Sequence, residues 1–208
     1  FLLETTRGAA LAVRRLHFTQ DNVAVETAAG LQTKILLSDL RAADYSQGKL
    51  VYLSDLQPIA VKWTPYIGLP AAAGFVHAFG LPREDLAYHG SALTLLTKGE
   101  NGRQSIQSFR KGLAIRSRTD LVYRIPRQMT KFVAVAGIDP ESADQGRVSL
   151  EVYADRKLLW QGEIDGRKEP QTIEVDIRGA RRLRILVDYG ENLDYGDRLH
   201  LAEARVLK

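Results

Sequence analysis

Short runs in which apolar and polar residues alternate one by one are the feature that most limits what this chain can form. The clearest runs are 148–153, 173–177 and 183–187, where Val, Ile or Leu stands at every second position. A period of two places alternate side chains on opposite faces of a strand, so each run predicts a strand with one buried face. From residue 93 onward such runs return about every ten residues, which is typical of an antiparallel sandwich or barrel. No segment sustains a helical period, so the sequence predicts an all-β protein.

The first 48 residues have the pattern of a smaller unit of the same class. Runs rich in Val, Leu, Ile, Thr and Phe are separated by polar or glycine-containing turns, and lie at 11–18, 22–27 and 32–36. Three or four short strands bury little apolar surface, so they form a weak core on their own. We therefore predict a small N-terminal β-meander over residues 1–48 and a larger antiparallel β-sandwich over residues 49–208.

Four local signals refine this outline. Residues 38–43 are the best candidate for a short helix, and Asp155-Arg156 reads as the turn of a two-residue hairpin, although it lacks the usual glycine. Residues 64–82 hold three prolines, three glycines and three consecutive alanines, which predicts a long loop. The two tryptophans, Trp63 and Trp160, lie at strand positions and are predicted to be core residues.

Composition excludes several classes of protein. Of 208 residues, 45% are hydrophobic and 26% charged, which is typical of a folded soluble domain rather than a disordered chain. The net charge of +4 is small for this length, so general nucleic-acid binding is not expected. No apolar run approaches the roughly 20 residues of a transmembrane helix, and the absence of cysteine excludes disulfides and thiolate chemistry. Residues 1–6 lack the order of a signal peptide and do not start with Met, so we expect that a preceding segment was trimmed.

Charge is distributed unevenly along the second unit. Residues 103–131 hold eight basic residues against Asp120 alone, whereas residues 188–203 hold five acidic residues against Arg198 alone. Because alternate residues of a strand share a face, Arg116, Arg118 and Arg124 are candidates for one positive stripe that would favour an anionic partner. A solvated face is the simpler interpretation.

Ordered sequence blocks in the second unit give a more specific signal. They are Tyr52-Leu53-Ser54-Asp55-Leu56, Asp85-x4-Gly90-x2-Leu93-x-Leu95, Phe109-x-Lys111-Gly112-Leu113-Ala114-Ile115, Gly137-Ile138-Asp139, 148–155 and Asp197-x2-His200-x2-Glu203-Ala204-Arg205. In this order and spacing they resemble the NPCBM family of carbohydrate-binding modules over about residues 49–208. The resemblance implies a jelly-roll β-sandwich of the galactose-binding-like type. It also implies a non-catalytic, glycan-binding module of an extracellular, periplasmic or cell-surface protein.

Candidate ligand residues come from one loop and one strand. Residues 189–197 combine two tyrosines, an amide, three carboxylates and two glycines, a composition typical of a polar recognition loop. Arg116 adds a planar fork of donors that suits a carboxylate or sulfate on an acidic glycan. We therefore predict a shallow ligand site, formed by Arg116, Asn192, Tyr195, Asp197 and His200. The alternatives are an acidic turn with a packed tyrosine, and a salt bridge from Arg116 to a carboxylate such as Asp197.

A structural calcium ion is a second expectation, and it rests on analogy with related sandwich modules. Such an ion needs six to eight oxygen ligands, mostly from carboxylates and carbonyls. Glu203 stands where the fold's carboxylate ligand often lies, and Asp55 at the start of the sandwich is its candidate partner. The simpler interpretation is that Glu203 faces solvent and that Asp55 caps a turn.

The chain shows no catalytic signature. His17, His77, His89 and His200 lack metalloprotease spacing and a nucleophile-elbow serine. His200 and Glu203 are three residues apart, which places them on opposite faces of a regular strand. We therefore predict that the chain is not an enzyme; a hydrolase would need a carboxylate pair in a cleft.

The main alternative to glycan binding is a degenerate module that serves as a protein-interaction or structural domain. Arg116 stands where the family has a histidine, and Leu201 stands where it has an aromatic residue. These two departures favour the alternative, whereas the tyrosine- and acid-rich loop favours glycan binding.

Overall fold

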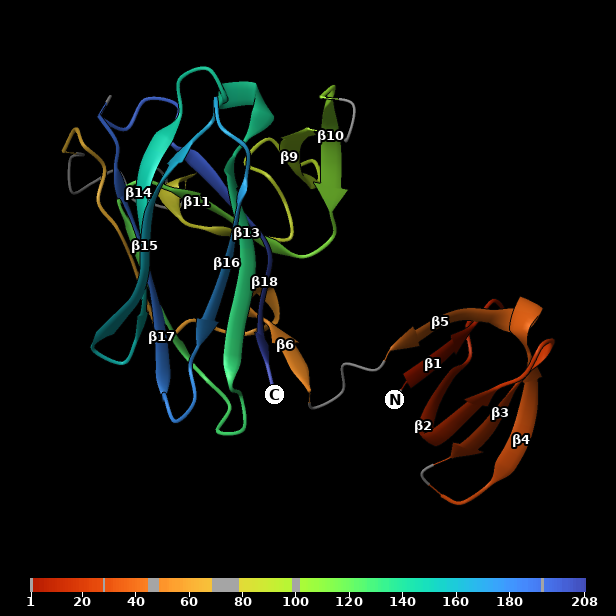
Figure 1. Cartoon of the computed structure of the whole chain (residues 1–208). Coiled ribbons are helices and arrows are strands. Elements are labelled where there is room, and N and C mark those ends of the chain that lie inside the picture. The colour runs from red at the N-terminus through yellow and green to blue at the C-terminus, as the bar shows by residue number, and fades with distance from the viewer. Residues whose placement is uncertain (1, 28, 45–48, 69–78, 99–101, 192) are drawn as a thin grey trace. The chain divides into compact units, whose positions relative to one another are not determined.

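The computed structural model describes residues 2–27, 29–44, 49–68, 79–98, 102–191 and 193–208, and these residues form almost only β-strands (Figure 1). The predicted all-β class is therefore confirmed. The chain divides into two compact units, Phe1–Leu50 and Val51–Lys208. Each unit has its own apolar cluster.

The first unit is one antiparallel sheet of five strands in the order β4-β3-β2-β1-β5. Its strands are β1 (Leu2–Thr5), β2 (Ala10–Phe18), β3 (Asn22–Thr27), β4 (Gln32–Leu36) and β5 (Leu40–Asp44). Leu3, Val13, Val23 and Val25 form its buried core. Val23 and Val25 are two residues apart and lie on the inward face of β3, within the predicted strand at 22–27.

The predicted helix over 38–43 is wrong. One 3₁₀ turn, η1 (Leu37–Asp39), is followed at once by strand β5, which pairs antiparallel with β1. A six-residue helix has too few internal hydrogen bonds to be stable by itself. The backbone groups of residues 40–44 find partners on β1 instead, so tertiary pairing overrides local preference.

The second unit is a β-sandwich of two antiparallel sheets. The first, here called the β18 sheet, has the order β16-β13-β18-β11-β8, and β6 also pairs with β18. Its strands are β6 (Leu50–Tyr52), β8 (Arg83–Glu84), β11 (Gly112–Arg116), β13 (Lys131–Ile138), β16 (Gln171–Asp176) and β18 (Arg198–Leu207). The second, the β17 sheet, consists of β15 (Lys157–Asp165), β14 (Arg147–Ala154), β17 (Arg182–Tyr189), β12 (Thr119–Arg124) and β7 (Ala60–Trp63), in that order.

Four shorter elements of the described residues also belong to this unit. Strands β9 (Leu93–Lys98) and β10 (Gln104–Phe109) form a separate hairpin, and η2 (Leu53–Asp55) and η3 (Pro140–Ser142) are 3₁₀ turns. The hairpin lies beside β13 and β18 (Figure 1).

The alternating runs of the sequence supply the core between the two sheets. Val148, Leu150 and Val152 of β14 and their counterparts on β17 are fully buried. The predicted hairpin turn is also confirmed, because Ala154 pairs with Lys157 across Asp155-Arg156. Asp155 has φ +53°, a left-handed conformation that aspartate tolerates better than most residues and that replaces the expected glycine.

The β18 sheet carries a second apolar cluster on its outer face, the face turned away from the core. On β18, Leu199 and Leu201 belong to the main core, whereas Ala202 packs with Leu93 and Ala114 in the outer cluster. A bulge interrupts this alternation at Glu203, which has φ +52°, and the pairing register with β13 shifts there. Beyond the bulge the even-numbered residues Ala204 and Val206 return to the main core.

Gly112 marks the closest approach of β11 to β18. It has φ +147°, and a Cβ built there would lie 2.6 Å from the carbonyl oxygen of Leu201. Both atoms belong to central strands of the sheet, so neither can move freely. Only glycine fits both the conformation and the space.

We therefore predict that Gly112→Ala lowers the free energy of unfolding by about 2–4 kcal/mol, because the new methyl group overlaps backbone atoms. Gly179→Ala is the matched control: Gly179 also has a left-handed φ, of +79°, but open space around it. It should cost only about 1–2 kcal/mol, the strain of the conformation alone. Urea denaturation of the three proteins measures the difference, and equal losses would contradict the packing argument.

Candidate functional site

An arginine held between two aromatic rings lies on the outer face of the β18 sheet. Arg116 is the last residue of β11, and its guanidinium carbon lies 4.4 Å from the ring centroid of Tyr88 and 4.7 Å from that of Phe79. These distances are within the range of cation–π contacts. Phe79 is 57% exposed, and Arg116 and Tyr88 are half-buried. We call these three residues the arginine–aromatic cluster.

Neighbouring contacts place the two rings. The indole Nε1 of Trp63 donates to the Ser117 carbonyl at 3.0 Å, and a Cβ on Gly80 would lie 2.1 Å from a ring carbon of Trp63. Glycine at position 80 therefore lets the segment that carries Phe79 lie flat against the indole. The hydroxyl of Tyr88 donates to the Leu81 carbonyl at 3.2 Å.

Burial and charge set the electrostatics of this cluster. Burial lowers the pKa of Arg116, and the positive charges of Arg198 and Arg83 act in the same direction. Arg198 on β18 lies directly opposite Arg116 in the strand pairing, and the guanidinium carbon of Arg83 lies 5.8 Å from the ring centroid of Tyr88. A guanidinium stays protonated despite such a shift. Burial also raises the pKa of Tyr88 to about 12, so it is a neutral hydrogen-bonding phenol at physiological pH. Two cations, Arg83 and Arg116, thus lie over the neutral Tyr88 ring, and Arg198 adds a third positive charge next to Arg116.

The loop between β17 and β18 borders the cluster. The Tyr189 hydroxyl donates to the Thr64 carbonyl at 2.6 Å, and its ring meets that of Tyr66 edge-on at 5.6 Å. Asp194 accepts a hydrogen bond from the backbone N–H of Tyr66 at 3.3 Å, and its charge also acts on Arg116. Tyr195 is 66% exposed. The loop therefore adds exposed aromatic surface and one carboxylate near Arg116.

Two of the predicted ligand residues are buried instead. Asp197 is 3% exposed, and its Oδ1 accepts from the Arg147 backbone N–H at 3.0 Å. Burial raises the pKa of this carboxyl group. His200 is fully buried, and its Nδ1 lies 2.8 Å from the carbonyl oxygen of Thr94. Asp197 and His200 thus hold the loop and the sheet together, whereas Arg116 and Tyr195 reach the surface.

The predicted calcium ligands are each already paired with a cation. Asp55 accepts a hydrogen bond from Lys111 Nζ at 2.5 Å, and the same ammonium lies 2.8 Å from Asp85 Oδ2. Glu203 accepts from Arg205 at 2.7 Å and from the Tyr52 hydroxyl at 3.1 Å. A calcium ion would have to displace both basic groups, so this arrangement does not fit one. Calcium at Asp55 and Glu203 stays a prediction of the sequence.

Comparison with known families matches residues 34–207 to the NPCBM/NEW2 domain. The chain belongs to this family. The expected resemblance is thereby confirmed. A search of curated proteins found no match.

Several solved structures share the fold of this NPCBM module. A Clostridium perfringens ZmpB segment with the CBM51-2 domain in complex with GlcNAc and INT domains has a TM-score of 0.62 and 20% identity, covering 95% of this chain and 40% of its own. The CBM51 of C. perfringens GH95 in complex with methyl-galactose has a TM-score of 0.60 and 24% identity, covering 76% and 99%. Tandem CBM51 modules of a family 98 glycoside hydrolase from Streptococcus pneumoniae have a TM-score of 0.61 and 20% identity. This match covers 76% of the present chain and 47% of the hydrolase segment. The chain therefore spans two fifths of the ZmpB segment, and these likenesses establish the sandwich fold.

Several expectations about charged residues in the NPCBM module change. No ion pair joins Arg116 to Asp197 in the part of the chain that the structure describes. The predicted positive stripe is wrong, because Arg116 lies in the β18 sheet whereas Arg124 lies in the β17 sheet beside Arg182. Arg118 pairs with Asp188 at 3.6 Å. Residues that follow one another across a turn between sheets do not share a face.

The remaining singled-out residues have mixed outcomes. Trp160 packs against the main core, but Trp63 supports the arginine–aromatic cluster. Leu201 is fully buried in the core. An aromatic residue at this position would therefore also be buried and could not stack on a sugar at the surface. His17 is exposed on β2. Asn192 and His77 lie outside the described residues.

Sequence reasoning missed Phe79, Tyr88 and Arg83 as members of the site. The only available signal was that Tyr88 lies inside the block from Asp85 to Leu95. Nothing in the sequence places this block beside β11, because Arg116 of β11 is 28 residues further along the chain than Tyr88.

Asp85 gives a test of the geometry that supports this block. Although burial acts to raise the pKa of Asp85, hydrogen bonds from Lys111 and the Gly112 N–H lower it. A carboxyl group whose pKa is lower in the folded state stabilises the fold above its unfolded pKa, and this contribution is lost as the pH falls through its folded pKa. We therefore predict that Asp85→Asn lowers the melting temperature at pH 7, and that the difference from the parent disappears under strongly acidic conditions. A difference independent of pH would contradict this.

Proposed function

We propose that this NPCBM module binds a glycan without catalysis, through the arginine–aromatic cluster. The observation that carries the proposal is a charged guanidinium fixed between two rings at the surface. Stacking sets the plane of Arg116, and its buried Nε has no hydrogen-bond partner among the described residues. A pre-oriented donor loses little conformational entropy when it binds a hydroxyl or an acid group.

Aromatic surface nearby suits the apolar face of a sugar ring. Phe79, Tyr66 and Tyr195 are each more than half exposed, so their rings are accessible to a ligand. Sugar C–H groups pack against such rings while the hydroxyls take hydrogen bonds from nearby polar groups. The relatives bound to methyl-galactose and GlcNAc make these two sugars the first probes.

The charge of the cluster favours an acidic glycan. Arg83, Arg116 and Arg198 lie around it, and two carboxylates face these three cations: Glu141 Oε2 lies 3.6 Å from Arg198, and the charge of Asp194 acts on Arg116. A carboxylate or sulfate would offset the mutual repulsion of these guanidinium groups and form paired hydrogen bonds with Arg116.

Membership of the NPCBM family supports a location outside the cytoplasm, which we include in the proposal. None of the helices formed by the described residues has the length and apolar character needed to cross a membrane.

A calorimetric titration with methyl-galactose, GlcNAc, and a sialylated and a sulfated galactoside tests the proposal. We predict weak binding that is strongest for an acidic sugar, because a shallow site makes few contacts. Arg116→Ala should reduce the affinity by roughly tenfold or more, since it removes a charge-assisted pair. The matched control is Arg124→Ala, which removes an exposed arginine from the β17 sheet and should bind like the parent.

Two results would contradict this assignment. Equal binding by the parent and the Arg116→Ala protein would place the sugar elsewhere. An absence of binding to every member of a broad glycan array would favour the protein-interaction or structural module, because the same exposed aromatic residues suit a protein partner.

A further inference from the structure

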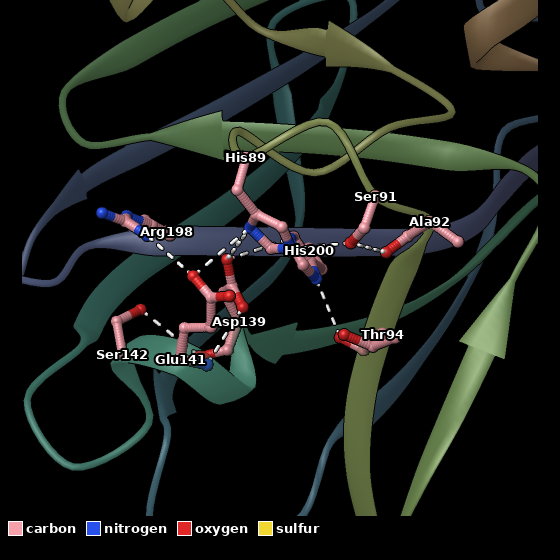
Figure 2. A network of polar contacts seen from close by, with 9 residues as sticks. All are labelled: His89, Ser91, Ala92, Thr94, Asp139, Glu141, Ser142, Arg198 and His200. Atoms are coloured by element: carbon pink, nitrogen blue, oxygen red, sulfur yellow. Dashed lines mark hydrogen bonds and ion pairs between the residues drawn. The ribbon is translucent and has the colours of Figure 1, made fainter.

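Four groups that typically bind metals converge under the turn that carries Tyr88. His89 Nδ1 lies 3.4 Å from Glu141 Oε2 and 3.8 Å from Asp139 Oδ2, and His200 Nε2 lies 3.6 Å from the same oxygen of Asp139 (Figure 2). The ligand atoms of His89, Asp139 and Glu141 all lie within 4.8 Å of one another. These four residues form what we call the His–carboxylate cluster.

Separate parts of the fold hold each member in place. Asp139 directly follows β13, and its Oδ1 accepts from the Glu141 N–H at 3.1 Å, which caps η3. His89 lies in the turn between β8 and β9, and its Nε2 lies 2.6 Å from the Ser91 hydroxyl oxygen. His200 projects from the centre of β18. The cluster is therefore fixed by secondary structure before any ligand arrives.

The hydrogen bond on the far side of each imidazole ring determines whether the nitrogen that faces the cluster carries a proton or a free lone pair. The carbonyl of Thr94 can only accept, so His200 Nδ1 carries the proton and Nε2 is bare in the neutral ring. The single hydroxyl proton of Ser91 goes to the Ala92 carbonyl, at 3.1 Å. In the tautomer in which Ser91 accepts from His89 Nε2, the Nδ1 of His89 also presents a lone pair to the cluster.

The buried part of the cluster lacks the partners that such groups need. Asp139 and His200 have fully buried side chains, and Asp139 Oδ2 and His200 Nε2 have no hydrogen-bond partner among the described residues. Two acceptors facing each other at 3.6 Å cannot bond to each other. Leaving both unsatisfied in the interior is costly, and a cation between them would remove that cost.

We propose that the His–carboxylate cluster is a binding site for a divalent transition-metal ion, with zinc as the type that fits. Imidazole and carboxylate are zinc ligands with bonds of about 2.0–2.2 Å, which in a tetrahedral site puts neighbouring ligand atoms about 3.3–3.6 Å apart. Three of the separations, those from His89 to Asp139 and Glu141 and from His200 to Asp139, are 3.4–3.8 Å and so are close to this spacing. Two imidazoles disfavour calcium and magnesium, which prefer oxygen.

Charge and access also suit a cation. The two carboxylates face one guanidinium, that of Arg198, which lies 3.6 Å from Glu141 Oε2. The side chains of His89 and Glu141 are 32% and 56% exposed, so an ion can enter from solvent on their side and reach buried Asp139. The hydrogen bonds from the ring nitrogens to Thr94 and Ser91 are the outer-shell contacts that orient metal-binding histidines.

Zinc titration of the tag-free, chelator-treated protein, followed by calorimetry and thermal melting, tests the site. We expect one zinc ion per chain and a higher melting temperature with zinc, but no comparable effect of calcium. His89→Ala should weaken zinc binding at least roughly tenfold, because it removes a ligand. His17→Ala is the matched control, since it removes an exposed imidazole from the first unit.

Asp139→Asn separates metal binding from simple stability. Its amide oxygen can keep the hydrogen bond from the Glu141 N–H, while its NH₂ takes the place of Oδ2 and can donate to His200 Nε2. The variant should therefore melt at or above the temperature of the metal-free parent, yet gain nothing from zinc. The proposal is overturned if the parent binds no zinc beyond the level of the His89→Ala protein, or if Asp139→Asn keeps full affinity. Because the probe is zinc alone, neither result bears on glycan binding.

Discussion

The close approach of β11 to β18 is the constraint on which the rest of the second unit depends. Gly112 allows the two backbones to meet, and the bulge at Glu203 then exchanges which residues of β18 face the core. Before the bulge the outer face carries Arg198 and His200, opposite Arg116 and Ala114 of β11. Both proposed sites therefore depend on how these central strands pair.

One turn serves both sites with adjacent residues. Tyr88 stacks on Arg116, and His89 faces Asp139 and Glu141. The turn is tied to the fold at its start, where Asp85 accepts hydrogen bonds from Gly112 N–H and Lys111. Strands supply Arg116 and His200, whereas the turn supplies the groups that complete each site. This division is common in recognition modules, because a rigid sheet lets short loops present precise chemistry.

The sequence predicted what depends on local pattern and missed what depends on distant contact. Alternating runs identified β14, β16 and β17, because a strand with one buried face leaves a period of two. Arg116 was identified from its position in a family block, but not its partners Phe79 and Tyr88. The His–carboxylate cluster joins residues from 89 to 200, and the positive φ of Glu203 that shapes this face has no sequence signal. The local pattern at residues 38–43 also misled, because it favoured a short helix where pairing with β1 makes a strand.

Mapping of backbone amide shifts during titration with an acidic galactoside shows whether this outer face of the β18 sheet binds the glycan. We expect the perturbed amides to cluster at residues 79–90, at Arg116 and at residues 193–198, which form the arginine–aromatic cluster and its bordering loop. Perturbations confined to the β17 sheet or to the first unit would contradict it.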